Sequence, residues 1–288
     1  MKDLNALLSP LSLEEFKGSH WPLLPFVTHD LSSSISELTN LPFLKSLDAM
    51  LAAWPGNVQV HLADKRDESS SIDVAPAIAK RHFNEKLALL FNNVQNISPV
   101  LKEWLANISA DLGLPKSTYS RCMVYATPDG KGTAAHFDQN INFVLQLHGT
   151  KTWWLAPNFT FVNPTERFTI GQPVDPELAS YALEEPPTTM PEPQEKIVLK
   201  PGSMLFVPRG YWHRTEAEGE ALALNFTFSQ PTWIDLLLLA LRSRLSLSPE
   251  WRELAKVDEP ARFDNLLAEL VEDLPNWQAE DILGATEG

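Results

Sequence analysis

Cysteine and glycine are scarce in this sequence. It contains one cysteine, Cys122, and 12 glycines among 288 residues. A lone cysteine excludes an intramolecular disulfide and argues against a cysteine-based zinc site, so a reducing compartment is expected. Few glycines beside 23 prolines disfavour a glycine-rich phosphate-binding fold and favour strands and loops bounded by prolines.

Basic residues are also in the minority. Lys and Arg number 23 against 37 Asp and Glu, which gives a formal net charge of −14. A field of this sign repels the phosphate backbone of nucleic acids and attracts basic polypeptides. Direct binding of DNA or RNA is therefore not expected, whereas a basic protein partner is compatible with the composition.

Long uninterrupted apolar runs are missing as well. The longest aliphatic stretch, residues 234–247, contains Arg242 and Arg244, so it is expected to form a packed helix and not a membrane span. The N-terminal stretch MKDLNALLSPLSLEEF has no apolar run that a signal peptide would need. We expect a cytoplasmic protein with no membrane association.

Short apolar runs separated by Pro, Gly and Asp occupy residues 119–230. They read RCMVYAT, INFVLQLHG, TKTWWLA, EKIVLKPG, SMLFVPRG and ALALNFTFS. Because no long helix intervenes, antiparallel pairing is favoured over β-α-β winding. The expected fold is mainly β, a double-stranded β-helix (the cupin-like jelly-roll) with flanking helical segments.

Three parts are expected along the chain. Residues 1–90 form an N-terminal extension of helices and strands, residues 91–232 the jelly-roll core, and residues 233–288 a C-terminal helical segment. A helix over 98–115 is indicated by a serine cap and a Gly-Leu-Pro end.

One segment of the core has no clear periodicity. Residues 158–195 are rich in Pro, Glu and Thr, which is typical of a long insertion over the mouth of a barrel. Together with Trp153, Trp212 and Arg209, this insertion is the candidate rim that meets the substrate.

Two histidines and an aspartate are candidate metal ligands. His136 and Asp138 are separated by one residue, so on a strand both side chains point to the same face. His213 follows 77 residues after His136, where a jelly-roll can bring it alongside. Two imidazoles and one carboxylate form the facial triad of non-haem iron(II) enzymes. The alternative is a satisfied core histidine at 136 and a turn residue at 213.

Lys151 is a candidate for binding an anionic cosubstrate. It lies 15 residues after His136, across a predicted Gly-Thr turn, so the following strand can point it into the same cavity. A lysine buried beside Trp153 and Trp154 requires an anionic partner, such as the carboxylate of 2-oxoglutarate that is far from the metal. Thr133 can add a hydroxyl to that carboxylate. The alternative is a surface lysine at the end of a hairpin.

Two asparagines are candidates for hydrogen bonds to the site. Asn142 shares the parity of the His136 strand if that strand is regular, and Asn225 lies among apolar residues where an unpaired amide is costly. Each could instead be a strand-end amide. Tyr125 and Gln146 are further residues that could face the cavity.

Three stretches resemble a known family. YATPDGKGTAAHFDQNINFVLQLHGTKTWWLA, LKPGSMLFVPRGYWHRT and NFTFSQPTWIDLL are similar to the JmjC-type 2-oxoglutarate oxygenases, most closely to the ribosomal oxygenases, which hydroxylate ribosomal proteins. The TP-x-G-x-G run, the LQL-x-G-x-K-x-W segment and the VPRG turn carry the likeness, which covers about residues 90–235.

The resemblance implies a site as well as a fold. It implies iron(II) at His136, Asp138 and His213, 2-oxoglutarate at Lys151 and Thr133, and O2 as the oxidant. Asparaginyl hydroxylases of the hypoxia-factor type share these positions and also those of the two asparagines at 142 and 225. The segment after residue 230 is short for the dimerisation helices and full winged-helix domain of the ribosomal oxygenases.

Three functions are compatible with these residues. The first is a hydroxylase of a protein side chain, acting on a basic ribosomal or translation-related polypeptide to which an acidic surface is complementary. The second is an oxygenase of a small molecule, such as a free or carrier-bound amino acid. The third is a metal-binding cupin that is not an oxygenase, against which Lys151 argues. The C-terminal helices, with Trp233, Leu236 and Leu237, form either a homodimer interface or a lid on the barrel.

Overall fold

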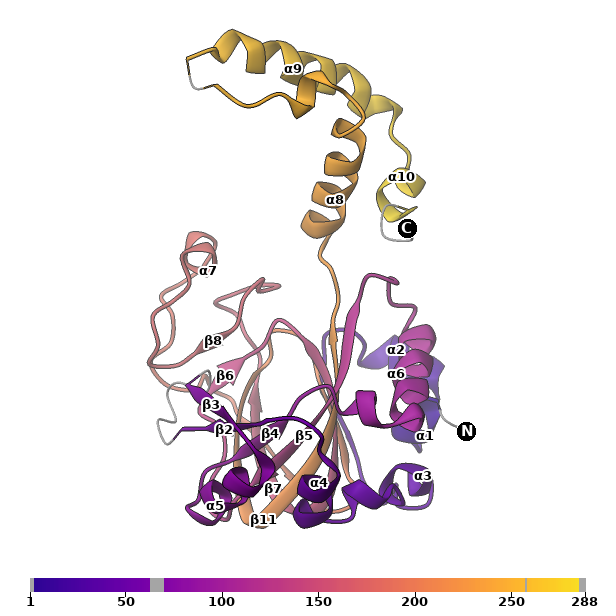
Figure 1. Ribbon diagram of the computed structural model, residues 1–288, viewed down its shortest axis with the longest axis vertical. Coiled ribbons are helices and arrows are strands. Elements are labelled where there is room, and N and C mark those ends of the chain that lie inside the picture. Colours follow the sequence, from indigo (N-terminus) through magenta and orange to yellow (C-terminus); the bar gives the residue numbers. More distant parts are fainter. Residues whose placement is uncertain (1–2, 63–69, 257, 285–288) are drawn as a thin grey trace. The chain divides into compact units, whose positions relative to one another are not determined.

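The computed structural model describes residues 3–62, 70–256 and 258–284, which fall into two units. The first unit comprises Met1–Gly113 and Ser120–Ser229, and the second comprises Leu114–Tyr119 and Gln230–Gly288. Figure 1 labels many of the helices and strands. The division of the chain at residues 90 and 232 stays a prediction.

The first unit is built on strands with short helices around them. Its strands are β1 (Phe26–Thr28), β2 (Val58–His61), β3 (Ser71–Val74), β4 (Leu89–Phe91), β5 (Tyr119–Thr127), β6 (His136–Phe137), β7 (Ile141–Ala156), β8 (Phe168–Thr169), β9 (Glu195–Leu199), β10 (Met204–Val207) and β11 (Trp212–Ser229). Its helices are α1 (Asn5–Leu8), α2 (Leu13–Ser19), α3 (Ser36–Thr39), α4 (Leu47–Ala53), α5 (Pro76–Asn84), α6 (Pro99–Leu112) and α7 (Pro176–Ser180).

The strands follow the path β1-β10-β7-β11-β5-β4-β2-β3, with β6, β8 and β9 paired off it. β6 pairs with β11 and β8, and β9 pairs with β7. The β7–β11, β7–β10 and β7–β9 pairs are antiparallel. Residues 142–145 of β7 pair with β10, and residues 151–155 pair with β9, so one strand takes part in two strand layers, as a jelly-roll requires.

The prediction of a Gly-Thr turn before Lys151 is wrong, because residues 149 and 150 lie inside the continuous strand β7. Gly149 has a φ of 68°, and the register of β11 shifts between Glu218 and Leu222 at the same level. A Cβ on Gly149 would lie 2.1 Å from the carbonyl oxygen of Glu220. Glycine therefore lets the two long strands pass this irregularity without a break in the pairing.

The predicted helix over 98–115 is present as α6, and its sequence explains its bounds. The Ser98 hydroxyl accepts a hydrogen bond from the Leu101 amide, and Pro99 occupies the first turn, where it has no hydrogen bond to lose. Gly113 ends the helix with a φ of 70°. The buried face of α6 contains Trp104 and Ile108, so the helix is held against the sheet by apolar contacts.

The second unit is helical. Its helices are α8 (Trp233–Leu245), α9 (Pro260–Asp273) and α10 (Ala279–Gly284). A capping box between Thr232 and Asp235 starts α8. Arg244 of α8 forms an ion pair with Asp273 of α9, and the hydrogen bond from Arg244 lowers the pKa of Asp273 to about 2. Within the described parts of the chain, no helix is both long enough and apolar enough to cross a membrane.

Candidate active site

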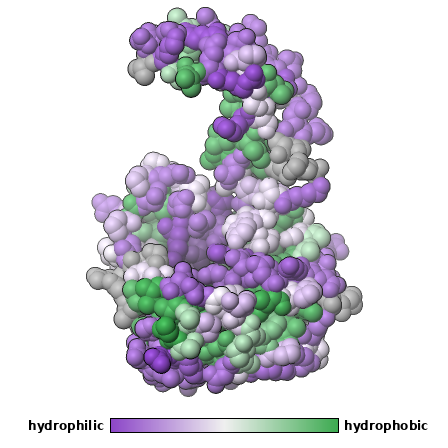
Figure 2. All heavy atoms as spheres, in the orientation of Figure 1, coloured by the Kyte–Doolittle hydropathy of each residue, from purple (hydrophilic) through white to green (hydrophobic). Residues whose placement is uncertain are grey.

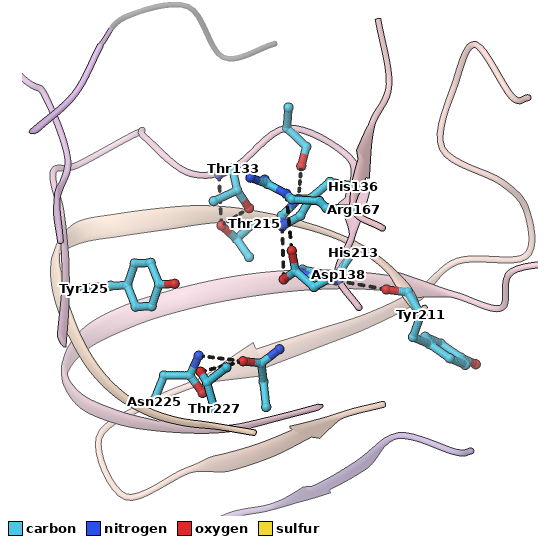
Figure 3. A network of polar contacts seen from close by, with 12 residues as sticks. Tyr125, Thr133, His136, Asp138, Arg167, Tyr211, His213, Thr215, Asn225 and Thr227 are labelled. Atoms are coloured by element: carbon cyan, nitrogen blue, oxygen red, sulfur yellow. Dashed lines mark hydrogen bonds and ion pairs between the residues drawn. The ribbon is translucent and has the colours of Figure 1, made fainter. Parts of the chain in front are cut away.

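The short strand β6 brings together residues that are far apart in the sequence. His136 in β6 pairs in register with His213 in β11, and the two ring centroids lie 4.1 Å apart. The Oδ2 atom of Asp138, just beyond β6, lies 3.8 Å from Nε2 of His136 and 3.7 Å from Nε2 of His213. Figure 3 shows the three side chains converging. One potential ligand atom from each lies within 4.8 Å of the others, so the three can bind one metal ion.

Backbone carbonyls fix which nitrogen of each imidazole faces the centre. Nδ1 of His136 lies 2.8 Å from the carbonyl oxygen of Ala134, and Nδ1 of His213 lies 2.9 Å from that of Tyr211. Because a carbonyl oxygen only accepts, the hydrogen belongs on Nδ1 and the lone pair on Nε2. Both Nε2 atoms are thereby prepared to bind a metal, and the donor set of two imidazole nitrogens and one carboxylate oxygen suits iron(II).

The protonation states suit metal binding too. Burial is the largest cause that lowers the pKa of His136 to about 4, and the positive charge of Arg167 is the next. This imidazole is therefore neutral at pH 7. Burial raises the pKa of Asp138, but His136, His213 and Arg167, with a contribution from Arg121, together hold that pKa below its ordinary value. A neutral imidazole and an ionised carboxylate are the forms that bind metal.

Arg167 is a residue of the site that sequence reasoning missed. Its Nε atom lies 3.2 Å from Oδ1 of Asp138, and Figure 3 shows it beside that carboxylate. Because Arg167 pairs with Oδ1, the Oδ2 atom is left on the side of the two histidines. Arg167 belongs to the 158–195 insertion and directly precedes β8, which pairs with β6. No spacing in the sequence indicates this contact.

Lys151 is buried in the same cavity, with 5% of its surface exposed. Its ammonium group donates a hydrogen bond to Oγ1 of Thr127 at 3.1 Å. The ammonium also lies 5.9 Å from the ring of Tyr125 and 5.8 Å from that of Trp153, within the range of cation–π attraction. Thr127 and Tyr125 lie two residues apart on β5 and so share its cavity face. Thr127 was not among the predicted residues.

Thr133 is placed by a close approach of two backbone segments. Its Oγ1 lies 2.9 Å from Oγ1 of Thr215, and its amide donates to the same hydroxyl at 3.0 Å. A Cβ on the preceding residue, Gly132, would lie 1.8 Å from the carbonyl oxygen of Thr215. Glycine at 132 is therefore required for Thr133 to reach β11.

The two asparagines form a buried cluster with a threonine. Oδ1 of Asn142 accepts hydrogen bonds from Nδ2 of Asn225 and Oγ1 of Thr227, each at 2.9 Å, and Figure 3 shows this cluster below the histidines. Oδ1 of Asn225 is buried and has no hydrogen-bond partner among the described residues. Gln146, in contrast, does not line the cavity: it is fully buried and donates to the carbonyl of His148.

The metal-binding and cosubstrate-binding residues predicted from the sequence all line one cavity of about 690 Å³. They are His136, Asp138, His213, Lys151, Thr133, Asn142 and Asn225. The structure therefore brings together in one place residues that come from β6, β7, β11 and the loops before and after β6.

The expected rim is wrong in one respect. Trp212 is fully buried in an apolar cluster with Phe137, Phe161 and Phe168. It neighbours His213 on β11, so strand alternation points its side chain away from the metal site. Arg209 instead ties the insertion down, with its guanidinium donating to the carbonyl oxygen of Pro164.

The chain is similar to known proteins of the family that the sequence motifs resemble. The JmjC domain matches residues 111–236. The chain is 35% identical to the uncharacterized protein YxbC of Bacillus subtilis over 258 residues, which is 88% of this chain and 78% of that protein. It is 25% identical to Ribosomal oxygenase 1 of Gallus gallus over 255 residues, 85% of this chain but 39% of that protein.

A solved structure confirms the predicted jelly-roll fold class. The Escherichia coli ribosomal oxygenase YcfD, solved in complex with cobalt and 2-oxoglutarate, matches with a TM-score of 0.56 at 20% identity, over 94% of this chain and 68% of that one. At this identity the likeness is one of fold.

Proposed function

The chain belongs to the JmjC domain family, and on that premise we propose that it is an Fe(II)- and 2-oxoglutarate-dependent dioxygenase that hydroxylates an amino-acid side chain of a protein. The observation that supports this most strongly is the presence of two histidines, one carboxylate and a buried lysine in a single cavity. The triad alone would suit any cupin metal site, but a buried lysine in the same cavity suits a cosubstrate with a distant carboxylate.

His136, Asp138 and His213 would hold the iron. When bound, iron(II) with 2-oxoglutarate and O2 supplies the oxidising power for hydroxylation of a C–H bond, with succinate and CO2 as coproducts. The protein's own contribution is orientation: the Ala134 and Tyr211 carbonyls direct each Nε2 to the metal. A metal held by only these three side chains would have coordination positions to spare for the cosubstrate and O2.

Lys151 would bind the carboxylate of 2-oxoglutarate that is far from the metal. Thr127 accepts one hydrogen bond from its ammonium group, which orients the cation, and a positively charged donor group of this kind suits a carboxylate. Thr133 also lines the cavity, where its hydroxyl contacts that of Thr215. Trp153 and Tyr125 would exclude water from this end of the cavity, which strengthens the charge pair.

A protein substrate is favoured by the size of the cavity and by the relatives. A volume of about 690 Å³ exceeds what 2-oxoglutarate alone requires and leaves room for a side chain. Ribosomal oxygenase 1 is among the relatives, so a ribosomal protein is the first substrate to examine. The compartment proposed is the cytoplasm, since a lone cysteine is compatible with a reducing environment.

The proposed function is tested by succinate formation. Protein loaded with Fe(II) and supplied with 2-oxoglutarate and O2 is expected to form succinate, and omission of Fe(II) is expected to stop this. A ribosomal protein mixture should raise the rate above the uncoupled level and gain one oxygen atom in a mass spectrum. Succinate formation that does not depend on Fe(II) would reject the proposal.

Arg167 gives a prediction about the metal affinity. Arg167→Gln is expected to weaken Mn(II) or Fe(II) binding about tenfold, because partners that orient a metal ligand typically contribute 10- to 100-fold. Arg167→Lys should restore most of that loss, since a cation beside Oδ1 of Asp138 is retained. The measurement is metal titration by calorimetry. The matched control is Arg214→Gln, whose guanidinium stacks 3.7 Å from the centroid of the Trp154 ring. An equal loss of metal affinity in Arg214→Gln would contradict a specific role for Arg167 in metal binding.

We also propose that α8 and α9 mediate a homodimer. Trp233 is 74% exposed and Leu238 58% exposed on α8, and Phe263 is 57% exposed on α9. Figure 2 shows hydrophobic residues gathered on the surface of α8. Contiguous apolar surface of this kind marks an interaction site, and a second copy of the same face is its simplest partner.

The oligomeric state is measured by sedimentation. The wild-type chain of 32.3 kDa is expected to sediment as a dimer, and Leu238→Glu as a monomer, because the charge would be buried in the interface. Ser243→Glu introduces the same charge at another exposed position of α8 and should leave the dimer intact. A monomeric wild type at micromolar concentration would exclude the dimer.

A further inference from the structure

The turn that joins β10 to β11 contacts the backbone of the proposed carboxylate ligand. It consists of Pro208, Arg209 and Gly210 and leads directly into the strand that carries His213. The amide of Gly210 donates a hydrogen bond to the carbonyl oxygen of Asp138 at 2.8 Å. The backbone of Asp138 is therefore held by the same turn that leads to His213.

The same turn also lies against the 158–195 insertion. Gly210 has a φ of 77°, and a Cβ on it would lie 2.7 Å from Cδ of Pro164. Glycine is therefore required for this close approach. At the start of the insertion, Nδ2 of Asn158 donates to the carbonyl oxygen of Gly210 at 3.0 Å. The turn thus connects the backbone of Asp138 to the insertion.

Arg209 binds the insertion through its guanidinium group. Its Nε and Nη2 atoms donate to the carbonyl oxygen of Pro164 at 2.9 and 2.7 Å, and Nη2 also donates to that of Asn163 at 3.1 Å. Hydrogen bonds from a charged donor are roughly twice as strong as neutral ones, and the planar guanidinium fixes their direction. Since Pro164 is buried, Arg209 holds a well-packed point of the insertion.

Arg167 lies three residues after this point. Its Nε atom pairs with Oδ1 of Asp138 at 3.2 Å, and directly after it the insertion enters β8, which pairs with β6. The segment from Pro164 to Arg167 is therefore held at both ends, by Arg209 at one end and by strand pairing at the other.

These contacts reach Asp138 by two routes. Gly210 holds its backbone, and Arg167 pairs with Oδ1 of its side chain. The other oxygen, Oδ2, lies 3.8 Å from Nε2 of His136 and 3.7 Å from Nε2 of His213. Because the turn takes part in both routes, the orientation of the carboxylate depends on where the turn holds the insertion.

We propose that Arg209 is a positioning residue for the metal site: by holding the segment that carries Arg167, it keeps Oδ2 of Asp138 turned toward the two histidines. The proposal rests on the proposed function, which makes Asp138 a metal ligand. Arg209 is not among the described residues that line the cavity, so its effect on metal binding passes through Arg167.

The test is a double-mutant cycle on metal affinity. Full-length protein is freed of metal with a chelator, and Mn(II) binding is measured by calorimetry. Arg209→Gln is expected to weaken Mn(II) binding about tenfold, the lower end of what partners of metal ligands contribute. In the Arg167→Gln background the same substitution should weaken binding less than about twofold further, because a residue that acts through Arg167 has little effect once Arg167 is gone.

Arg209→Lys is a second variant that keeps the positive charge. An ammonium can donate to the carbonyl oxygen of Pro164 but lacks the planar fork of a guanidinium, so we expect about threefold weaker Mn(II) binding. This loss should also disappear in the Arg167→Gln background. Because lysine retains a donor, Arg209→Lys carries the test if Arg209→Gln does not fold.

Two controls separate positioning from a general loss of stability or of charge. Thr160→Val removes the hydrogen bond from the buried Thr160 hydroxyl to Oε1 of Glu184 at 3.0 Å, elsewhere in the insertion. It should lower the melting temperature without changing Mn(II) affinity. Arg81→Gln removes a positive charge at an exposed position of α5 and should change neither quantity.

Three results would each overturn the role of Arg209. They are wild-type Mn(II) affinity in Arg209→Gln, or in Arg209→Lys if only that variant folds; an undiminished loss in the Arg167→Gln background; and an equal loss in Thr160→Val. Wild-type protein that binds no Mn(II) would instead reject the metal site and the proposed function with it. Normal wild-type binding together with any of the three results would reject only the positioning role.

Discussion

His213→Ala is expected to abolish Fe(II)-dependent succinate formation. His213 supplies one of three ligand atoms, and its Nε2 lies 3.7 Å from Oδ2 of Asp138. Loss of a residue that merely orients a ligand costs about 10- to 100-fold in metal affinity, so loss of a ligand itself should cost on the order of 10³-fold. The measurement is succinate formed per enzyme at saturating 2-oxoglutarate, with metal content determined in parallel.

A histidine elsewhere on the first unit provides the control. His82 of α5 lies 3.4 Å from Glu85, and it does not line the cavity. His82→Ala should retain full metal content and activity. Because His213 is buried beside Trp153, circular dichroism and the melting temperature of the His213→Ala variant are needed to show that it folds. A folded His213→Ala variant that binds iron with wild-type affinity would contradict the assignment.

Lys151→Met is expected to raise the KM for 2-oxoglutarate about 100-fold, because removal of one partner of a buried charge pair costs about 3 kcal/mol. Methionine has a similar length and fills the space between Tyr125 and Trp153, so metal binding should change little. The expected signature is therefore a large change in cosubstrate affinity at nearly constant metal affinity. Steady-state kinetics with varied 2-oxoglutarate, together with metal titration, measures both.

Lys196 offers the matched control for this substitution. It lies on β9, exposed, with its ammonium 5.8 Å from the ring of Trp154 on the other face of the strand pair. Lys196→Met should leave both affinities unchanged. If Lys151→Met had a normal KM for 2-oxoglutarate, the cosubstrate would have to bind elsewhere in the cavity.

The sequence was sufficient to predict the fold class and to select residues that prove to lie in one cavity. His136, Asp138 and Lys151 occur within a short stretch, where strand alternation and the cost of burying a charge restrict what each can do. His213 was found through the Pro-Arg-Gly turn before it and the family resemblance.

The features that sequence reasoning missed depend on tertiary contacts. Arg167 reaches Asp138 because β8 pairs with β6, and no local pattern in the insertion encodes that pairing. Thr127 contacts Lys151 across the cavity from β5. The turn predicted before Lys151 was wrong because a glycine of positive φ can also serve an irregularity inside a continuous strand.

The central claim is that one cavity binds a metal through the triad and 2-oxoglutarate through Lys151. A crystal structure of the protein soaked anaerobically with Mn(II) and 2-oxoglutarate tests it most directly, with anomalous scattering to locate the metal. The predicted result is an anomalous peak in bonding contact with Nε2 of His136, Oδ2 of Asp138 and Nε2 of His213, and a carboxylate within hydrogen-bond distance of the Lys151 ammonium. A metal bound away from these three atoms, or a cosubstrate carboxylate that pairs with Arg121 instead of Lys151, would contradict the claim.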